Sequence, residues 1–307
     1  MLVTALAPII WGSTYLVTSE LLPPGRPLLA AALRALPAGV LLIAVARRLP
    51  QGSWWWRATV LGALIFGAFF ALLFVAAYRL PGGVAATILS LQPLLVAGLA
   101  ARLLGERLTA RTAVAGVAGI AGVGLLVLRA DARLDGLGIA AAIAGAVVFA
   151  TGIVLSKRWT SPAPLLATTG WQLVAGGLLV LPLALLVEGA PAALSTANLA
   201  GYGYLAIIGT ALTYPLLFRG IAALPATAVS FLALLSPVVA ASLGWLALGQ
   251  SLTATQILGA LIVLGALVAA QTPIPTRGQA RSPTEQPPRS RSTPPPANRP
   301  PTNPRSR

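Results

Sequence analysis

Ten long apolar segments make up most of this 307-residue chain, and each is long enough to cross a lipid bilayer. A membrane-spanning helix needs roughly 20 mainly apolar residues. Short breaks rich in proline and glycine, such as 23–25 and 80–83, separate the segments. They fall at about 2–20, 28–46, 57–78, 84–104, 111–128, 135–156, 165–187, 199–218, 226–248 and 253–271. Since a helix satisfies its own backbone polar groups in lipid, we predict an all-α membrane protein with ten transmembrane helices.

The composition restricts the chemistry that such a protein can perform. Only 9% of the residues are charged, whereas about 25% is usual in soluble domains. Cysteine and histidine are both absent, which excludes disulfides, thiol nucleophiles, imidazole bases and the usual zinc and haem ligand sets. We therefore expect no metal, no cofactor and no enzymatic activity.

The sequence repeats itself, and the repeat defines two halves. Each half holds five predicted spans, which places the first repeat at about 1–135, the second at 136–271 and a tail at 272–307. One group of matches shares an offset of 144 residues and another an offset of 137. The matches include Leu80-Pro81 with Leu224-Pro225, Pro93 with Pro237, Gly105 with Gly249, Leu108-Thr109 with Leu252-Thr253, and Leu28-Leu29-Ala30 with Leu165-Leu166-Ala167.

An odd number of spans in each half predicts that the second half enters the membrane from the opposite side. Cytoplasmic loops carry an excess of Lys and Arg, and the positions of these residues exchange between the halves as inversion requires. With both termini cytoplasmic, the outside loops hold four basic residues: Arg26, Arg79, Arg129 and Arg133. The inside loops hold Arg47, Arg48, Arg57, Arg102, Arg107, Arg111, Lys157, Arg158 and Arg219. Inverted repeats of this kind are characteristic of secondary transporters.

The formal net charge of +15 does not indicate nucleic-acid binding, because the basic residues lie in these loops and in the tail. Residues 272–307 hold seven arginines, many prolines and little that can be buried, so we predict a disordered tail. Contact with anionic lipid headgroups would contribute about 1 kcal/mol per basic residue near the surface. The alternative is a solvated tail without a ligand.

Three motifs resemble those of one transporter group. They are Ile10-Trp11-Gly12-Ser13-Thr14-Tyr15, Arg34 inside the second span, and Leu104-Gly105-Glu106-Arg107-Leu108-Thr109 followed by glycines. In their order and duplication they resemble the drug/metabolite transporter superfamily, in its ten-span EamA-type branch with two tandem domains. The resemblance implies a multi-pass inner-membrane protein that moves metabolites or drugs through a cavity lined by spans one to four and six to nine.

Several polar and aromatic side chains within the spans are candidate substrate contacts. Arg34 is costly in lipid, so we expect it either to face the bundle interior and bind an anionic group or a helix end, or to snorkel to the outer surface. Trp171 is its equivalent in the second half and lies beside Gln172. These two residues, together with Trp11, Thr14 and Tyr15 of the first span, either line the cavity or pack the core.

Prolines mark a second group of candidates, because a proline frees helix carbonyls that can line a cavity. The polar residues beside potential helix breaks are Tyr78, Gln92, Tyr214 and Ser236. Pro93 and Pro237 occupy equivalent positions, which favours paired gating kinks; kinks that serve only packing are the alternative.

Two further features concern the helix ends. Glu106 lies one turn after Arg102 and next to Arg107, which favours a structural ion pair, and its equivalent in the second half is Gln250. The Trp54-Trp55-Trp56 run beside Arg57 is typical of an interfacial aromatic belt.

The leading interpretation is a secondary transporter or exporter of a small organic metabolite that is amino acid-like, nucleobase-like or drug-like and works by alternating access. Arg34 suggests a substrate with an anionic group. A lipid-modifying membrane enzyme and a non-transporting scaffold that recruits partners through the tail are the alternatives. The expected partners are the small-molecule substrate and membrane lipid.

Overall fold

The computed structural model describes residues 2–80, 82–127, 135–190, 193–248 and 253–271, and these residues form helices joined by short turns. Ten helical stretches within this part of the chain are long and apolar enough to cross a membrane, in agreement with the predicted all-α ten-span fold. The tail from residue 272 onward and Gln250 lie outside the described residues.

The first five spans contain interrupted as well as continuous helices. The first span consists of two pieces, the third contains a π-helix, and the fourth is again in two pieces. In order they are α1 (Leu2–Gly12) with α2 (Thr14–Leu21), α3 (Pro27–Ala46), α4 (Trp54–Gly62) with η1 (Ala63–Ala68) and α5 (Phe69–Arg79), α6 (Gly82–Leu89) with α7 (Gln92–Leu103), and α8 (Ala110–Val127).

The last five spans follow a similar plan. The eighth span contains a π-helix and the ninth is in two pieces. They are α9 (Gly136–Arg158), α10 (Leu165–Val187), α11 (Thr196–Ala206) with η2 (Ile207–Leu212) and α12 (Thr213–Ala223), α13 (Ala226–Leu232) with α14 (Leu235–Leu248), and α15 (Ala254–Gln271). The two π-helices are separated by the same 144 residues that relate the sequence matches.

Side-chain and backbone chemistry explains where several helices begin. The Asp135 carboxylate accepts a hydrogen bond from the Gly138 N–H at 2.7 Å and so caps α9. Ser195 and Asn198 form a reciprocal capping box at the start of α11. Such contacts satisfy backbone donors that have no partner inside the helix.

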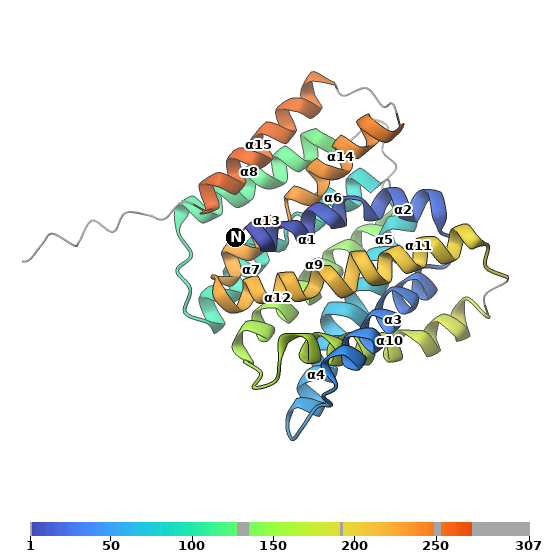
Figure 1. The fold of residues 1–307 in the computed structure, drawn as a ribbon. Helices are drawn as coiled ribbons and strands as arrows, with labels where there is room; N and C mark the ends of the chain where they lie inside the picture. The colour runs from blue at the N-terminus through green and yellow to red at the C-terminus, as the bar shows by residue number, and fades with distance from the viewer. Residues whose placement is uncertain (1, 81, 128–134, 191–192, 249–252, 272–307) are drawn as a thin grey trace, which may run out of the picture. The chain divides into compact units, whose positions relative to one another are not determined.

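Pairs of spans pack side by side along much of their length. The helix α3 lies along α10, and α8 lies along α15 at one edge of the bundle (Figure 1). Gly259 permits the second contact, because a Cβ there would lie 2.5 Å from the Leu126 nitrogen and 2.6 Å from the Gly122 oxygen. Small residues let membrane helices approach closely where the hydrophobic effect does not drive association.

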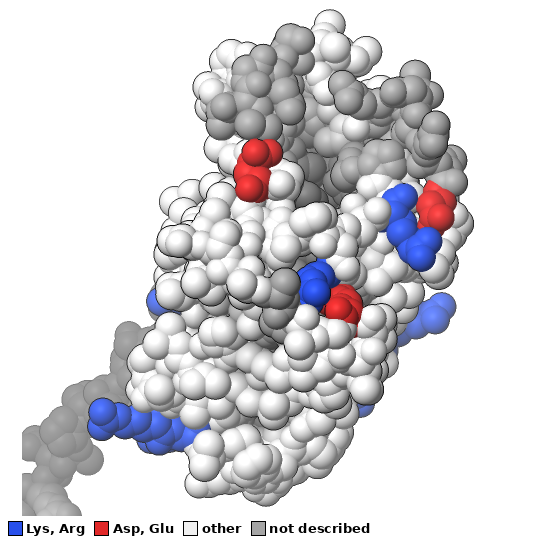
Figure 2. Space-filling model, turned by 90° about the vertical axis from the view of Figure 1, so that its right-hand side faces the viewer, with Lys and Arg blue, Asp and Glu red and all other residues white. Residues whose placement is uncertain are grey.

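The charged residues separate toward two ends of the bundle. Nine described cations lie near one end of the bundle, which we call the basic end. This end consists of the C-termini of α3, α7, α9 and α12 and the N-termini of α4, α8, α10 and α13. Glu106 is the only described acidic residue there, while the other described acids, Glu20, Asp135 and Glu188, lie at the opposite end. Figure 2 shows few charged side chains, which lie singly or in small groups on a largely uncharged surface. An uncharged surface of this kind is suited to contact with lipid.

Candidate solute-binding site

A single carbonyl oxygen in the π-helix η2 connects three spans at the centre of the bundle. The Gly209 oxygen accepts hydrogen bonds from the Trp11 Nε1–H at 3.0 Å, the Arg34 Nη2–H at 3.1 Å and the Thr213 hydroxyl at 2.7 Å. A π-helix changes the usual helical hydrogen-bond pattern, and such segments are frequent at functional sites. The π-helix therefore brings the first, second and eighth spans together at one point.

Arg34 lies in the interior and does not snorkel to the surface. Its side chain is 3% exposed, its Nε–H donates to the Thr210 hydroxyl at 2.9 Å, and its guanidinium lies 4.6 Å from the centre of the Phe70 ring. A cation over an aromatic face gains about 0.5–2 kcal/mol, with the larger value where water is excluded. Arg34 thus fastens α3 to η2, which is the interior placement that the sequence analysis considered.

Aromatic rings from both halves pack around Tyr214, which is 1% exposed. Its ring centre lies 5.0 Å from that of Trp11, 4.6 Å from Phe66 and 6.1 Å from each of Phe70 and Phe218. These separations are in the range at which tilted and edge-to-face ring pairs attract each other. The cluster forms a rigid aromatic core next to Arg34.

A small cavity lies beside this core, between the broken fourth and ninth spans. It occupies about 20 Å³, which is close to the space that a single water molecule requires. Gln92 comes from the start of α7, Ser230 and Ala233 from the end of α13, and the rest from α1, α7, α9, α12 and α13. The lining residues are Trp11, Gln92, Val96, Phe149, Ile153, Leu217, Val229, Ser230 and Ala233.

The structure brings together four of the predicted site residues: Trp11, Arg34, Gln92 and Tyr214. Thr14 and Gln172 are also inside the bundle, where the Thr14 hydroxyl and the Gln172 Oε1 have no hydrogen-bond partner among the described residues. Buried polar atoms in proteins are nearly always paired, either with protein groups or with ordered water, so these two atoms can each accept a further hydrogen-bond partner. The side chain of Tyr15 lies outside the described residues.

Two other predicted site residues lie at the ends of the bundle. The Trp171 indole N–H donates to the Arg48 carbonyl at 2.7 Å, and its ring packs against Trp54 at the basic end. Tyr78 is 39% exposed and donates from its hydroxyl to the Pro23 carbonyl at 3.3 Å at the opposite end. Neither residue contacts the central aromatic cluster.

Both prolines predicted to mark gates follow helix breaks. Pro93 is in the first turn of α7, which begins three residues after α6 ends. Pro237 is in the first turn of α14, after a similar break from α13. Ser236 is also in the first turn of α14, and its carbonyl oxygen would lie 2.9 Å from a Cβ on Gly12. The ninth span therefore packs directly on the first.

Sequence reasoning did not identify Thr210, Thr213, Phe149 or Ser230 as site residues. The sequence gives little indication of Thr210 and Thr213, because threonine is common in membrane spans. No sequence motif indicates the π-helix η2 that positions these two side chains. The interpretation of Glu106 also needs correction. Within the described part of the chain no ion pair joins it to Arg102 or Arg107, since its carboxylate is occupied by backbone N–H groups of α13.

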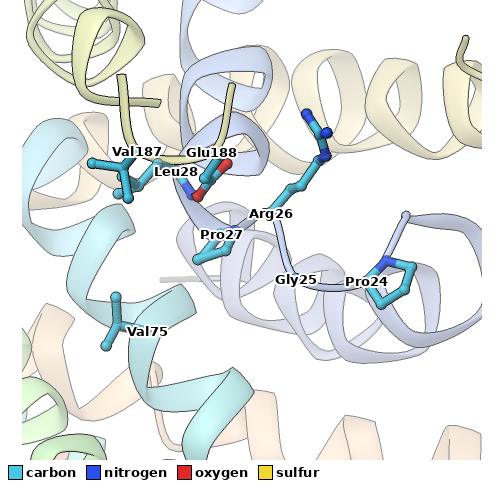
Figure 3. A pocket seen from close by; sticks show the side chains of 8 residues that line it. All are labelled: Pro24, Gly25, Arg26, Pro27, Leu28, Val75, Val187 and Glu188. Atoms are coloured by element: carbon cyan, nitrogen blue, oxygen red, sulfur yellow. The ribbon is translucent and has the colours of Figure 1, made fainter. Parts of the chain in front are cut away.

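A second hollow of about 510 Å³ opens at the end opposite the basic end, where α3 begins (Figure 3). The Glu188 carboxylate accepts hydrogen bonds from the Leu28 and Leu29 N–H groups at 2.6 and 2.9 Å and so caps α3. Arg26 extends away from Glu188 in Figure 3 and donates to the Gly189 and Ala190 carbonyls. These hydrogen bonds hold the ends of α3 and α10 together beside the hollow.

These features define a multi-pass membrane transport protein: ten apolar helices, two of them broken at related positions around a central cavity. The chain belongs to the EamA-like transporter family, whose sequence profile matches residues 1–128 and 136–270. This confirms the resemblance to the drug/metabolite transporter superfamily and places the protein in the inner membrane.

Named relatives and a solved structure support the same assignment. The chain is 45% identical to Protein PecM of Dickeya dadantii over 267 residues, which cover 86% of this chain and 90% of that protein. It is 31% identical to the uncharacterized inner membrane transporter YedA of Escherichia coli, over 85% of this chain and 86% of that one. A crystal structure with 22% identity superposes with a TM-score of 0.74, covering 88% of this chain and 95% of that one, and so shows the same fold.

Proposed function

We propose that the protein is a secondary transporter that moves a small, largely apolar, ring-bearing organic solute by alternating access. The observation that carries this proposal is the cavity between the broken fourth and ninth spans, which is walled by Trp11 and Phe149 and lined almost entirely by apolar atoms. Transporter sites typically lie where repeats meet and helices are discontinuous. Aromatic walls offer flat apolar contact, and Gln92 and Ser230 are the polar residues among those that line the cavity.

The placement of Arg34 argues against the anionic substrate suggested by the sequence. Its guanidinium contacts Gly209, Thr210 and Phe70, all within the protein. An acidic solute would have to separate the guanidinium from these partners, and charge-assisted hydrogen bonds contribute about 1.5–3 kcal/mol each. A neutral ring system with hydrogen-bonding edges, as in a nucleobase-like or drug-like compound, needs no such rearrangement.

The volume of the cavity supports alternating access. Sites for drug-sized ligands occupy about 300–1,000 Å³, whereas this cavity occupies about 20 Å³. A solute can therefore enter only if helices that line the cavity move apart. The breaks before Pro93 and Pro237 provide equivalent places for such movement in the two halves.

The proposed orientation has the basic end facing the cytoplasm, in accordance with the positive-inside rule. A secondary mechanism follows from the sequence, which contains no P-loop of the GxxxxGK[ST] type to bind ATP. The matched pairing of spans and the two π-helices at one offset support two related halves, and the odd number of spans in each half supports their inversion.

The test is solute uptake into proteoliposomes with a panel of nucleobases, aromatic amino acids, planar drugs and dicarboxylates. We expect uptake of a ring-bearing compound that Trp11→Ala reduces at least about tenfold, the equivalent of 1.4 kcal/mol. Trp55→Ala is the matched control, because Trp55 is 59% exposed and does not line the cavity. Uptake confined to dicarboxylates, or an equal loss in both variants, would contradict the proposal.

A further inference from the structure

The turn at Leu224-Pro225, between α12 and α13, is held by two charged side chains from other parts of the chain. On one side, the Glu106 carboxylate accepts hydrogen bonds from the Ala226 N–H at 2.7 Å and the Thr227 N–H at 3.2 Å. It also accepts one from the Thr227 hydroxyl at 2.8 Å. Glu106 thereby satisfies the first backbone donors of α13, which have no partner within the helix.

Lys157 holds the other side of the same turn. Its ammonium group donates to the Ile221 carbonyl at 2.8 Å and to the Leu224 carbonyl. Ile221 lies in the last turn of α12 and Leu224 directly follows the helix, at the end where backbone acceptors are unpaired and a positive charge is favoured. An anion at the start of one helix and a cation at the end of the other therefore fix the turn from both sides.

The two charges reach this turn from different segments. Glu106 lies between α7 and α8 in the first half, directly after Gly105, whose φ of +69° gives the sharp turn that directs the carboxylate toward α13. Lys157 lies at the end of α9. The Leu224-Pro225 turn is thus tied to the fourth, fifth and sixth spans.

The fastened helix forms part of the central cavity. Val229 and Ser230 of α13 line it, one turn after the residues that Glu106 contacts. Opening the cavity toward the basic end requires α13 to move away from α7, which carries Gln92 on the other wall. That movement separates Thr227 from Glu106.

We propose that Glu106 and Lys157 are positioning residues of the transport cycle, a clamp that holds the cavity closed toward the basic end. This inference rests on the proposed alternating access. The positions equivalent to Lys157 and Glu106 in the other half are Glu20 and Gln250, so the same charge pair is not repeated in the sequence. Glu20 is exposed and contacts only the neighbouring Ser19 hydroxyl among the described residues. The clamp therefore favours the state of the transport cycle in which the cavity is closed toward the basic end.

The natural absence of cysteine allows a direct test on the full chain. Ser230→Cys introduces a reporter thiol on the cavity wall, and inside-out membrane vesicles present the cytoplasmic face to a membrane-impermeant maleimide. Adding Glu106→Ala removes charge-assisted hydrogen bonds, and a loss of about 1.4 kcal/mol shifts a two-state equilibrium tenfold. We expect the labelling rate to rise about tenfold with Glu106→Ala and to stay unchanged with Glu20→Ala.

Two further variants keep the test decisive if Glu106→Ala misfolds. Glu106→Gln retains one acceptor oxygen, so its labelling rate should lie between those of the native residue and alanine. Thr227→Val removes the hydroxyl that donates to Glu106 but keeps both backbone donors, so the labelling rate at Ser230→Cys should rise by less than with Glu106→Ala.

An unchanged labelling rate in both Glu106→Ala and Glu106→Gln would overturn the clamp, as would an equal rise with Glu20→Ala. Labelling requires no solute, so it is independent of the uptake panel. If no ring-bearing solute is transported but labelling rises as expected, the substrate proposal fails and the clamp stands.

Discussion

Substituting alanine for Gly176 tests how tightly the third and seventh spans are packed. Gly176 lies in α10, against the π-helix η1. A Cβ at this position would lie 2.5 Å from the Gly62 oxygen, 2.8 Å from the Phe66 Cβ and 2.9 Å from the Gly67 nitrogen. Ordinary van der Waals contact begins near 3.4 Å, so α10 would have to move by about 0.9 Å away from a backbone that has little freedom to yield.

The magnitude follows from two opposing effects. Alanine is favoured over glycine in a helix interior by about 1 kcal/mol, and overpacking a close contact costs about 1–3 kcal/mol. Two of the three nearest atoms at Gly176 are backbone atoms, which places the cost near the upper limit. We therefore expect Gly176→Ala to lower the free energy of unfolding by about 1–2 kcal/mol.

Gly265 provides the matched control, because it lies within α15 and a Cβ there meets nothing within 4 Å. Gly265→Ala should be neutral or stabilising by up to about 1 kcal/mol. The propensity gain is the same in both variants, so their difference isolates the overpacking cost. The measurement is thermal unfolding in detergent followed by tryptophan fluorescence, and equal midpoints for the two variants would refute the packing argument.

Three other changes have distinct expected outcomes. Arg34→Lys cannot reproduce the fork of contacts with Gly209 and Thr210, so it should lower the unfolding free energy by about 1–3 kcal/mol, whereas native-like thermal unfolding would show that these contacts are not stabilising. Trp171→Phe removes one hydrogen bond at the basic end, at a cost of about 1 kcal/mol, and should leave the KM for solute uptake unchanged; a raised KM would place Trp171 in the site. Removal of 272–307 should preserve uptake in proteoliposomes, and its loss would favour the scaffold alternative.

The number and kind of spans could be predicted from sequence because lipid imposes a simple requirement. Every backbone group must be paired within a helix, and each helix must be about 20 apolar residues long. The repeat followed from the constant offset between matching prolines and turns, such as Pro93 with Pro237. The structure has helix breaks at both of these positions.

Burial of Arg34 was one of two placements open from the sequence, because an arginine in a span either finds an interior partner or snorkels to the surface. Its partner was not foreseeable. The Gly209 carbonyl lies 175 residues away, and it meets Arg34, Trp11 and Thr213 together only because η2 is a π-helix packed against α1 and α3. A local sequence pattern does not show which residues of distant spans bind the same carbonyl oxygen.

The sequence by itself determined the membrane class, the ten spans and the residues that are costly to leave in lipid, since these depend on composition and length. The tertiary structure decided how those residues are used. Glu106 has Arg102 and Arg107 as neighbours in the chain, yet its carboxylate binds the start of α13, 120 residues away. The physical reason is that unpaired N–H groups at a buried helix end need an acceptor more than an arginine exposed at the membrane surface needs a counterion.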